Sequence, residues 1–164
     1  MDINTPKGKE ATAQEQLLLR SLRKQYISKG IDVQFAETDK TMPVSLDGVM
    51  IIKDQLAGVY EVKCRNMNLA KLKDSYSNEM LLTYDKLRSG VDVSARLMVP
   101  FYCVVFLVDE PLGLLIQLTD NKGQIIANAR LERTRTPKSV NGGTIVRTNA
   151  YVDMSTAHPF PIVD

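Results

Sequence analysis

The sequence predicts an α/β fold in which helices flank a mixed central sheet, with a C-terminal β-hairpin as an extension. Stretches with helical periodicity alternate with short runs of β-branched and aromatic residues, which is the pattern of a sheet covered by helices. A chain of 164 residues, 44% hydrophobic and 24% charged, is long enough to bury a core. We therefore interpret 1–164 as a single domain, with a core at about 12–118 and a basic hairpin and tail at 124–164.

The overall composition argues against several classes of protein. A formal net charge of +2 gives no general affinity for nucleic acids or membranes, so a basic surface would need local clustering. No signal-peptide pattern opens the chain, and its longest apolar run is too short to span a membrane. Cys64 and Cys103 lie in predicted strands without metal-ligand spacing, which favours buried, reduced thiols. We expect a cytoplasmic protein of a host cell or virus-infected cell, without a membrane partner.

A first helix is predicted to begin at about residue 12 and to end at Ser28. Thr12 and Glu15 have the spacing of a capping box, and Lys29-Gly30 is a typical stop signal. Glu15 also lies on the predicted inward stripe of this helix. Its carboxylate could therefore act as a cap alone, or act as a cap and also reach a site at the sheet edge.

Strands and a second helix are predicted to follow. The second helix is expected at about 75–89 and should end at Gly90. The chain before and after it should form a right-handed crossover between parallel strands, whereas the first three strands can be antiparallel. The predicted strands are 31–38, 46–52, 57–64, 97–108 and 112–118, and 53–56 is the loop of the hairpin that the second and third of them form. The predicted buried stripe of the second helix is Tyr76, Met80, Tyr84 and Leu87.

The C-terminal part predicts a basic strand pair and an extended tail. The pair spans 124–133 and 144–153, with Asn141-Gly142-Gly143 as the bend. This arm could clamp DNA, mediate dimerisation or be an ordinary solvated hairpin. The tail, 155–164, contains two prolines. The cations of the arm are Arg130, Arg133, Arg135, Lys138 and Arg147.

The predicted hairpin carries an unusual set of ionisable residues, Asp47, Glu61 and Lys63. Residues two apart in a strand share a face, so Glu61 and Lys63 project to one side. Asp47 joins them only if it pairs with Glu61 or Lys63, because pairing with Val62 would turn it to the other face. Two carboxylates suit Mg²⁺ or Mn²⁺ completed by water and phosphate, and the lysine could orient an attacking hydroxide or stabilise a transition state.

Simpler interpretations of these residues exist. A cross-strand salt bridge on a solvated sheet face would use the same residue types. The acidic-x-lysine triplet is also not specific, since Asp120-Asn121-Lys122 repeats it in a predicted turn. His158 is the single histidine, which argues against a histidine-based nuclease, a Ser-His triad or a zinc site.

Asp47 followed by Glu61-Val62-Lys63, within a helix–strand–hairpin–helix–strand order, resembles the PD-(D/E)XK nuclease superfamily, which includes restriction endonucleases and Holliday-junction resolvases. The resemblance covers about 12–118 and implies a restriction-endonuclease-like αβββαβ core that hydrolyses DNA with Mg²⁺ or Mn²⁺. It implies that Lys63 is the catalytic lysine. The metal ligands it implies are Asp47, Glu61, the Val62 backbone carbonyl and, as in several members, Glu15.

Two departures from the superfamily pattern are visible. Leu46 stands where the name-giving proline would be, and Met80 stands where the exonuclease-like branch has glutamine. The second departure argues against the exonuclease-like branch and leaves the superfamily resemblance intact.

DNA is the partner that these expectations imply. Four cations flank the site and could grip phosphates, although a solvated face is the ordinary role of such scattered charges. Symmetric cutting of duplex or junction DNA would call for a homodimer, which we favour. The rival functions are a catalytically silent DNA-binding or assembly protein with a nuclease-like fold, and a viral structural protein. The four cations are Arg65, Lys71, Lys73 and Arg88.

Overall fold

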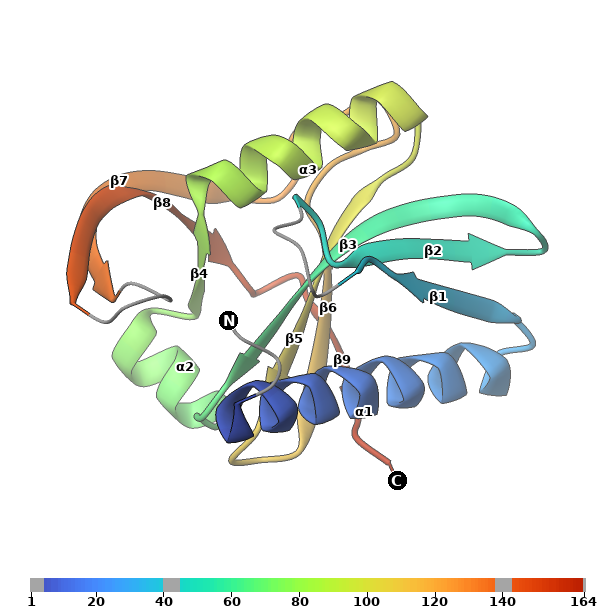
Figure 1. Cartoon of the computed structure of the whole chain (residues 1–164), viewed down its shortest axis with the longest axis horizontal. Helices are drawn as coiled ribbons and strands as arrows, with labels where there is room; N and C mark the ends of the chain where they lie inside the picture. Colours follow the sequence, from blue (N-terminus) through green and yellow to red (C-terminus); the bar gives the residue numbers. More distant parts are fainter. Residues whose placement is uncertain (1–4, 40–44, 138–142, 164) are drawn as a thin grey trace.

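The computed structural model describes residues 5–39, 45–137 and 143–163. A six-stranded sheet runs through its centre, with α1 on one side and α3 on the other, and a smaller sheet lies beside α2 (Figure 1). The α/β class with a mixed central sheet is thus as predicted. In chain order the elements are α1 (Pro6–Ser28), β1 (Val33–Glu37), β2 (Gly48–Ile52), β3 (Gln55–Arg65), α2 (Leu69–Tyr76), β4 (Glu79–Thr83), α3 (Tyr84–Leu97), β5 (Phe101–Leu107), β6 (Leu112–Gln117), β7 (Ala129–Pro137), β8 (Thr144–Asp153) and β9 (His158–Pro161).

Helix α1 begins well before the predicted capping box. Thr5 is its N-cap and accepts a hydrogen bond from the Gly8 N–H at 3.1 Å, and Pro6 occupies the first helical position. Thr12 lies inside the helix, where its hydroxyl donates to the Gly8 carbonyl. The predicted start at residue 12, and with it the capping role of Glu15, is therefore wrong. The predicted end is correct, since the helix stops at Ser28.

The main sheet has the order β1-β2-β3-β5-β6-β9. Strands β1, β2 and β3 are antiparallel, and β3 runs parallel to β5, as the sequence predicted. The expected tail contributes more than an extended chain, because β9 pairs with β6. Beyond β9, the Val163 N–H donates at 3.0 Å to the hydroxyl of Ser21, which is buried on α1. The C-terminal segment therefore ties the sheet edge to the first helix.

Both faces of the main sheet are buried around β3, which gives this strand two apolar surroundings. On one face, Tyr60 and Val62 pack with Leu18 and Leu22 of α1. On the other face, Val59 belongs to a second hydrophobic cluster that includes residues of α3, β5 and β8. Glu61 lies on this second side, where Lys86 of α3 reaches it. A charged residue of β3 is thereby placed inside a covered sheet face.

The predicted second helix at 75–89 is wrong, because that stretch contains the end of α2, strand β4 and the start of α3. Ser77 and Asn78 have φ values of 52° and 59°, which end α2. In β4 the buried residues alternate, as pairing with β8 requires. Only Met80 and Leu87 of the expected stripe are buried, whereas the rings of Tyr76 and Tyr84 are exposed. Tertiary strand pairing overrides the local helical periodicity here.

The smaller sheet has the order β4-β8-β7; β4 comes from the chain between β3 and β5, whereas β7 and β8 follow β6. The predicted C-terminal strand pair is present as β7 and β8, although β7 spans Ala129–Pro137 instead of 124–133. Lys138 and the Asn141-Gly142 part of the predicted bend lie outside the described residues. Because β8 also pairs with β4, the arm is integrated into the crossover and is not a separate appendage.

The structure bears on the predicted state of the two cysteines and on the apolar length of the helices. Cys64 and Cys103 are free thiols, and burial raises the pKa of each to about 12. Neither is therefore a reactive thiolate at neutral pH. Among the helices of the described residues, none combines the length and the apolar character that crossing a membrane demands.

Gly90 lies inside α3 and does not end it, because the Phe101 ring of β5 occupies the space beside it. A Cβ atom at this position would lie 2.1 Å from a ring carbon of Phe101. We predict that Gly90→Ala lowers the free energy of unfolding by about 1–3 kcal/mol, although alanine is the better helix former by about 1 kcal/mol. Chemical denaturation measures the change, and Asp92→Ala, at an exposed position of α3, should be neutral or stabilising. An equally stable Gly90→Ala would contradict the close packing.

Candidate active site where β2 begins

The register of the β2–β3 hairpin decides where Asp47 lies. Lys53 and Asp54 form a tight two-residue turn, both with positive φ, so Ile52 pairs with Gln55. A bulge beside Met50 and Ile51 then shifts the register by one residue, and Gly48 pairs with Tyr60. Continuing this pairing puts Asp47 opposite Glu61, which is the register that the predicted site requires. The expected four-residue loop, without a bulge, would have put Asp47 opposite Val62.

The site forms where β2 begins and β3 continues without that neighbour. Strand β2 starts at Gly48, whereas β3 extends to Arg65. The Val62 N–H, beyond the last pair, donates instead to Oδ2 of Asp47 at 2.7 Å. On the same residue, the Val62 carbonyl accepts from Lys63 Nζ at 3.3 Å. Side chains thus satisfy backbone groups that a neighbouring strand would otherwise pair.

Glu61 is the most buried charged group of the site, with a side chain only 2% exposed. Lys63 Nζ donates to its Oε1, and Lys86 Nζ donates to its Oε2 at 2.9 Å. The same Lys86 Nζ lies 3.8 Å from Oδ1 of Asp47. One ammonium group therefore lies near both carboxylates, and Asp47, Glu61 and Lys63 are brought together as the sequence predicted. The glutamate is not part of a solvated surface salt bridge.

Sequence reasoning missed Lys86. Its contribution depends on α3 beginning at Tyr84, which points Lys86, in the first helical turn, at Glu61 of β3. The expected helix at 75–89 also contained Lys86, but its buried stripe was assigned to other residues. A sequence signal did exist in the Thr83-Tyr84-Asp85 start, where a potential N-cap precedes an acidic first turn.

Burial is the main cause of the electrostatic state of Glu61. Removal from water raises the pKa of its carboxyl, the Asp47 charge adds to the rise, and Lys63 and Lys86 oppose it. The net direction is upward, so the folded protein disfavours the ionised carboxylate compared with water. Raised pKa values of this origin are typical of functional sites, although buried structural ion pairs show them too.

Glu15 is not brought onto the face that carries Glu61 and Lys63. Burial raises the pKa of Cys64, and the Glu15 charge adds to this rise. Glu15 acts in the same direction on Tyr60. Tyr60 and Cys64 alternate with Glu61 and Lys63 along β3, so Glu15 lies with the residues on the α1 side. The largest influences on the pKa of Glu61 are burial, Lys63, Asp47 and Lys86.

The four predicted DNA-binding cations are scattered. Arg65 follows Lys63 on the same face of β3 and donates to the Leu81 carbonyl at 3.5 Å. Lys71 and Lys73 are exposed on α2, and Arg88 is exposed on α3. Lys73 lines a depression together with three carboxylates, which disfavours a phosphate there. These carboxylates belong to Asp74, Asp109 and Glu110.

The donor atoms of the site suit a hard divalent cation only as a small set. Among the described residues, no cluster of three or more His, Cys, Asp or Glu side chains is arranged to hold a metal ion. Mg²⁺, however, commonly uses one or two protein carboxylates and takes its other ligands from water and substrate phosphate. Asp47, Glu61 and the Val62 carbonyl fit that pattern. Glu15 does not add to the set.

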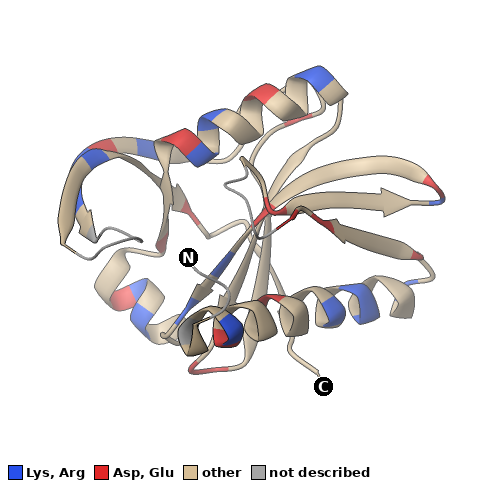
Figure 2. Cartoon of the chain, viewed as in Figure 1, with Lys and Arg blue, Asp and Glu red and all other residues tan. Residues whose placement is uncertain are grey.

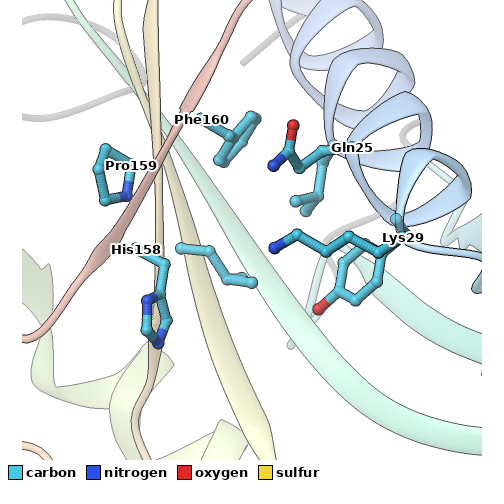
Figure 3. Close-up of a pocket in the computed structure, with 8 residues that line it drawn as sticks. Gln25, Lys29, His158, Pro159 and Phe160 are labelled. Carbon is cyan, nitrogen blue, oxygen red and sulfur yellow. The ribbon is translucent and has the colours of Figure 1, made fainter.

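A different pocket lies between α1 and the strands β6 and β9 (Figure 3). It measures about 170 Å³, and its lining includes Gln25, Lys29, His158 and Phe160. No carboxylate lines it, and α1 places it on the other side of the sheet from Glu61. The carboxylate–lysine cluster is therefore the stronger candidate for an active site.

The raised pKa of Glu61 predicts how stability depends on pH when the carboxylate is replaced by an uncharged isostere. The penalty on ionised Glu61 is absent below its ordinary pKa of about 4.3 and grows as pH rises through the higher folded-state value. In EDTA, Glu61→Gln should therefore affect the free energy of unfolding more favourably at pH 8 than at pH 4. Denaturation curves at the two pH values measure this.

Asp153 provides a matched control with the opposite sign. The Ser155 N–H donates to its carboxylate at 2.9 Å and lowers the pKa of that group. Ionised Asp153 therefore favours folding above its ordinary pKa, and this contribution is lost as pH falls through the lower folded value. Asp153→Asn should be destabilising at pH 8. The same direction of pH dependence for Glu61→Gln would contradict the electrostatic description of Glu61.

Comparison of the chain with protein-family models, curated proteins and solved structures finds no match. Its chemistry therefore has to be inferred from its own residues. The residues that carry this inference are the buried Glu61, the edge carboxylate of Asp47, and the two lysines that reach them.

Proposed function

We propose that the protein is a metal-dependent deoxyribonuclease that hydrolyses phosphodiester bonds at Asp47, Glu61 and Lys63. The observation that carries this proposal is that one cationic group, the Lys86 ammonium, lies near both carboxylates. Two carboxylates around one cation, beside a second lysine, form an arrangement suited to phosphodiester hydrolysis. DNA processing in repair, recombination, restriction or a phage life cycle is the setting that we propose, in the cytoplasm of a host or infected cell.

Each residue of the cluster has a role in this proposal. Asp47, Glu61 and the Val62 carbonyl would hold Mg²⁺ or Mn²⁺, which when bound neutralises charge on the phosphate and acidifies water. Lys63 is partly exposed and lies next to Glu61, so its ammonium is placed to orient the nucleophile and to stabilise negative charge on phosphate oxygens. The hydrogen bond from the Val62 N–H fixes the carboxylate of Asp47 in position.

The order of elements supports a restriction-endonuclease-like core. Helix α1, the β1–β2–β3 meander, a helix-containing crossover and the parallel strand β5 follow one another as in the expected αβββαβ arrangement. The insertion of β4 and the short helix α2 before α3 is a departure from it. The carboxylates of Asp47 and Glu61 lie at the start of β2 and on β3, the strand that pairs with β5 after the crossover.

The rival proposal is a nuclease-like fold that binds DNA or assembles without cleavage. One observation favours it: both oxygens of Glu61 already accept hydrogen bonds from lysines. A satisfied, buried ionic cluster of this kind can be a purely structural feature. Cleavage and metal-binding measurements separate the two proposals.

The nuclease proposal predicts a cleavage activity that depends on Lys63. With Mg²⁺ or Mn²⁺, the wild-type chain should cut at least one of supercoiled, linear or branched DNA, and Lys63→Ala should be slower by about 10²–10³-fold. Lys122→Ala is the matched control, because Lys122 ends the similar acidic-x-lysine triplet in a turn, and it should cut at the wild-type rate. Equal rates for wild type and Lys63→Ala, or no cutting of any substrate, would sink the proposal.

The position of Lys86 predicts that it competes with a divalent cation for the carboxylates. Removing its charge should make Mn²⁺ bind at least about tenfold more tightly to Lys86→Met than to wild type, because like charges at this distance repel strongly in a partly buried site. Calorimetry or Mn²⁺ resonance spectra without DNA measure the affinity. Lys71→Met, on exposed α2, should leave it unchanged, and equal Mn²⁺ affinity for wild type and Lys86→Met would argue against a shared site.

A further inference from the structure

The cleft between the end of β3, α2 and the β4-β8-β7 sheet is a second site that the proposed reaction does not use. Its volume is about 700 Å³. It opens beside the curled β7–β8 arm, where several of the basic residues gather (Figure 2). The side chains that matter for its chemistry are Arg65, Tyr76, Glu79, Arg130, Arg147 and Tyr151.

The cleft is cationic, and two of its guanidinium groups keep their charge uncompensated. Arg65 donates to the backbone carbonyls of Cys64 and Leu81, and Arg147 donates to the Thr136 hydroxyl at 2.9 Å. These acceptors are neutral. Within the described part of the chain, neither arginine has a carboxylate at ion-pair distance. An anion in the cleft would therefore meet two available positive charges.

The third arginine of the cleft is placed differently. Arg130 pairs with Glu79 at 2.7 Å and with Glu132, so two carboxylates more than offset its single positive charge. Its guanidinium plane lies 4.2 Å from the ring centroid of Tyr151. Near it, Tyr76 ends α2 with 47% of its surface exposed. In proteins that bind single-stranded nucleic acids, exposed aromatic rings and guanidinium groups stack on the bases. Neighbouring cations hold the phosphates.

The cleft adjoins the carboxylate–lysine cluster through β3. Glu61, Lys63 and Arg65 alternate along one strand and share a face, and Arg65 also contacts β4. A polyanion held at Lys63 would thus reach Arg65 next and then the cleft. The cleft volume lies in the range of ligand pockets, about 300–1,000 Å³, which suits part of one strand.

We propose that this cleft binds a single strand of nucleic acid, with phosphates at Arg65 and Arg147 and a base against Tyr76. Binding in the cleft stands on its own contacts, whereas its use in guiding a strand to Glu61 and Lys63 rests on the proposed nuclease function. The substrate class that follows is DNA with a single-stranded segment next to the bond that is cut.

The test measures fluorescence anisotropy of a labelled oligothymidylate of about 15 nucleotides with the full chain in EDTA, across a salt series. Arg147→Gln should weaken binding at least about fivefold and reduce the slope of log affinity against log salt by about 0.7. Tyr76→Ser should weaken binding about tenfold without changing the slope, because it removes stacking and no charge. Thermal melting of each variant verifies folding, and Arg147→Lys, which keeps the charge, should retain the wild-type slope.

Arg133→Gln is the matched control, since Arg133 lies exposed on β7 outside the cleft and the charge change is identical. It should weaken binding less than twofold. An effect of Arg133→Gln as large as that of Arg147→Gln, no effect of Tyr76→Ser, or equally tight binding of a duplex of the same length would each overturn the inference.

The outcomes also separate this inference from the nuclease proposal. Oligonucleotide binding that depends on Arg147 and Tyr76, without cleavage of any DNA in Mg²⁺ or Mn²⁺, would leave the cleft as a binding site and remove the nuclease function. Cleavage that requires Lys63, without oligonucleotide binding in EDTA, would do the reverse.

Discussion

The open edge of β3 is the constraint on which the rest of the site depends. Strand β3 continues past the point where β2 begins, so among the described residues the backbone of Val62 and Cys64 faces a side without a strand partner. Such an edge invites pairing with another chain unless charged side chains or a covering element protect it. Here the Asp47 carboxylate accepts a hydrogen bond from the Val62 N–H. Lys63 donates a hydrogen bond to the Val62 carbonyl, and Arg65 donates one to the Cys64 carbonyl. The side chains that protect the edge of β3 are therefore also the ones that concentrate charge there.

Glu61 adds a buried carboxylate to this protected edge. Its side chain points into a face covered by α3, where burial disfavours its charge, and only ammonium groups offset that cost. A structural role alone would be served as well by an apolar residue, because replacing a buried ionic cluster by hydrophobic side chains is often neutral or stabilising. A buried carboxylate whose ionised form is disfavoured by burial is the observation that supports the proposal of a functional role for Glu61.

Much of the fold followed from local patterns, and the failures have a common cause. The alternation of 31–38 and the stop at Lys29-Gly30 predict their elements correctly because single faces or caps decide them. The apolar run in 97–108 also predicts a strand, but β5 begins at Phe101, because Leu97 still belongs to α3. The prediction for 69–97 is wrong because β4 forms by pairing with β8, about seventy residues further on in the chain. Lys86 was missed with it. The predicted start of α1 is wrong for a simpler reason. Thr5 and Pro6 begin the helix, whereas the prediction relied on a capping-box pattern that lies inside it.

The position of Asp47 shows where prediction from sequence reaches its limit. The residue types and the required face could be read from the sequence, but the register depends on a one-residue bulge beside Met50 and Ile51, for which Gly58 in the facing strand is only a weak signal. A two-residue turn without the bulge would place Asp47 opposite Tyr60, on the α1 side, because each one-residue shift reverses the face. In this hairpin, two local features together bring Asp47 opposite Glu61, the tight turn at Lys53-Asp54 and the bulge. Bulges of this kind often aim side chains at functional sites, so the irregularity itself strengthens the proposal that Asp47 and Glu61 act as a pair.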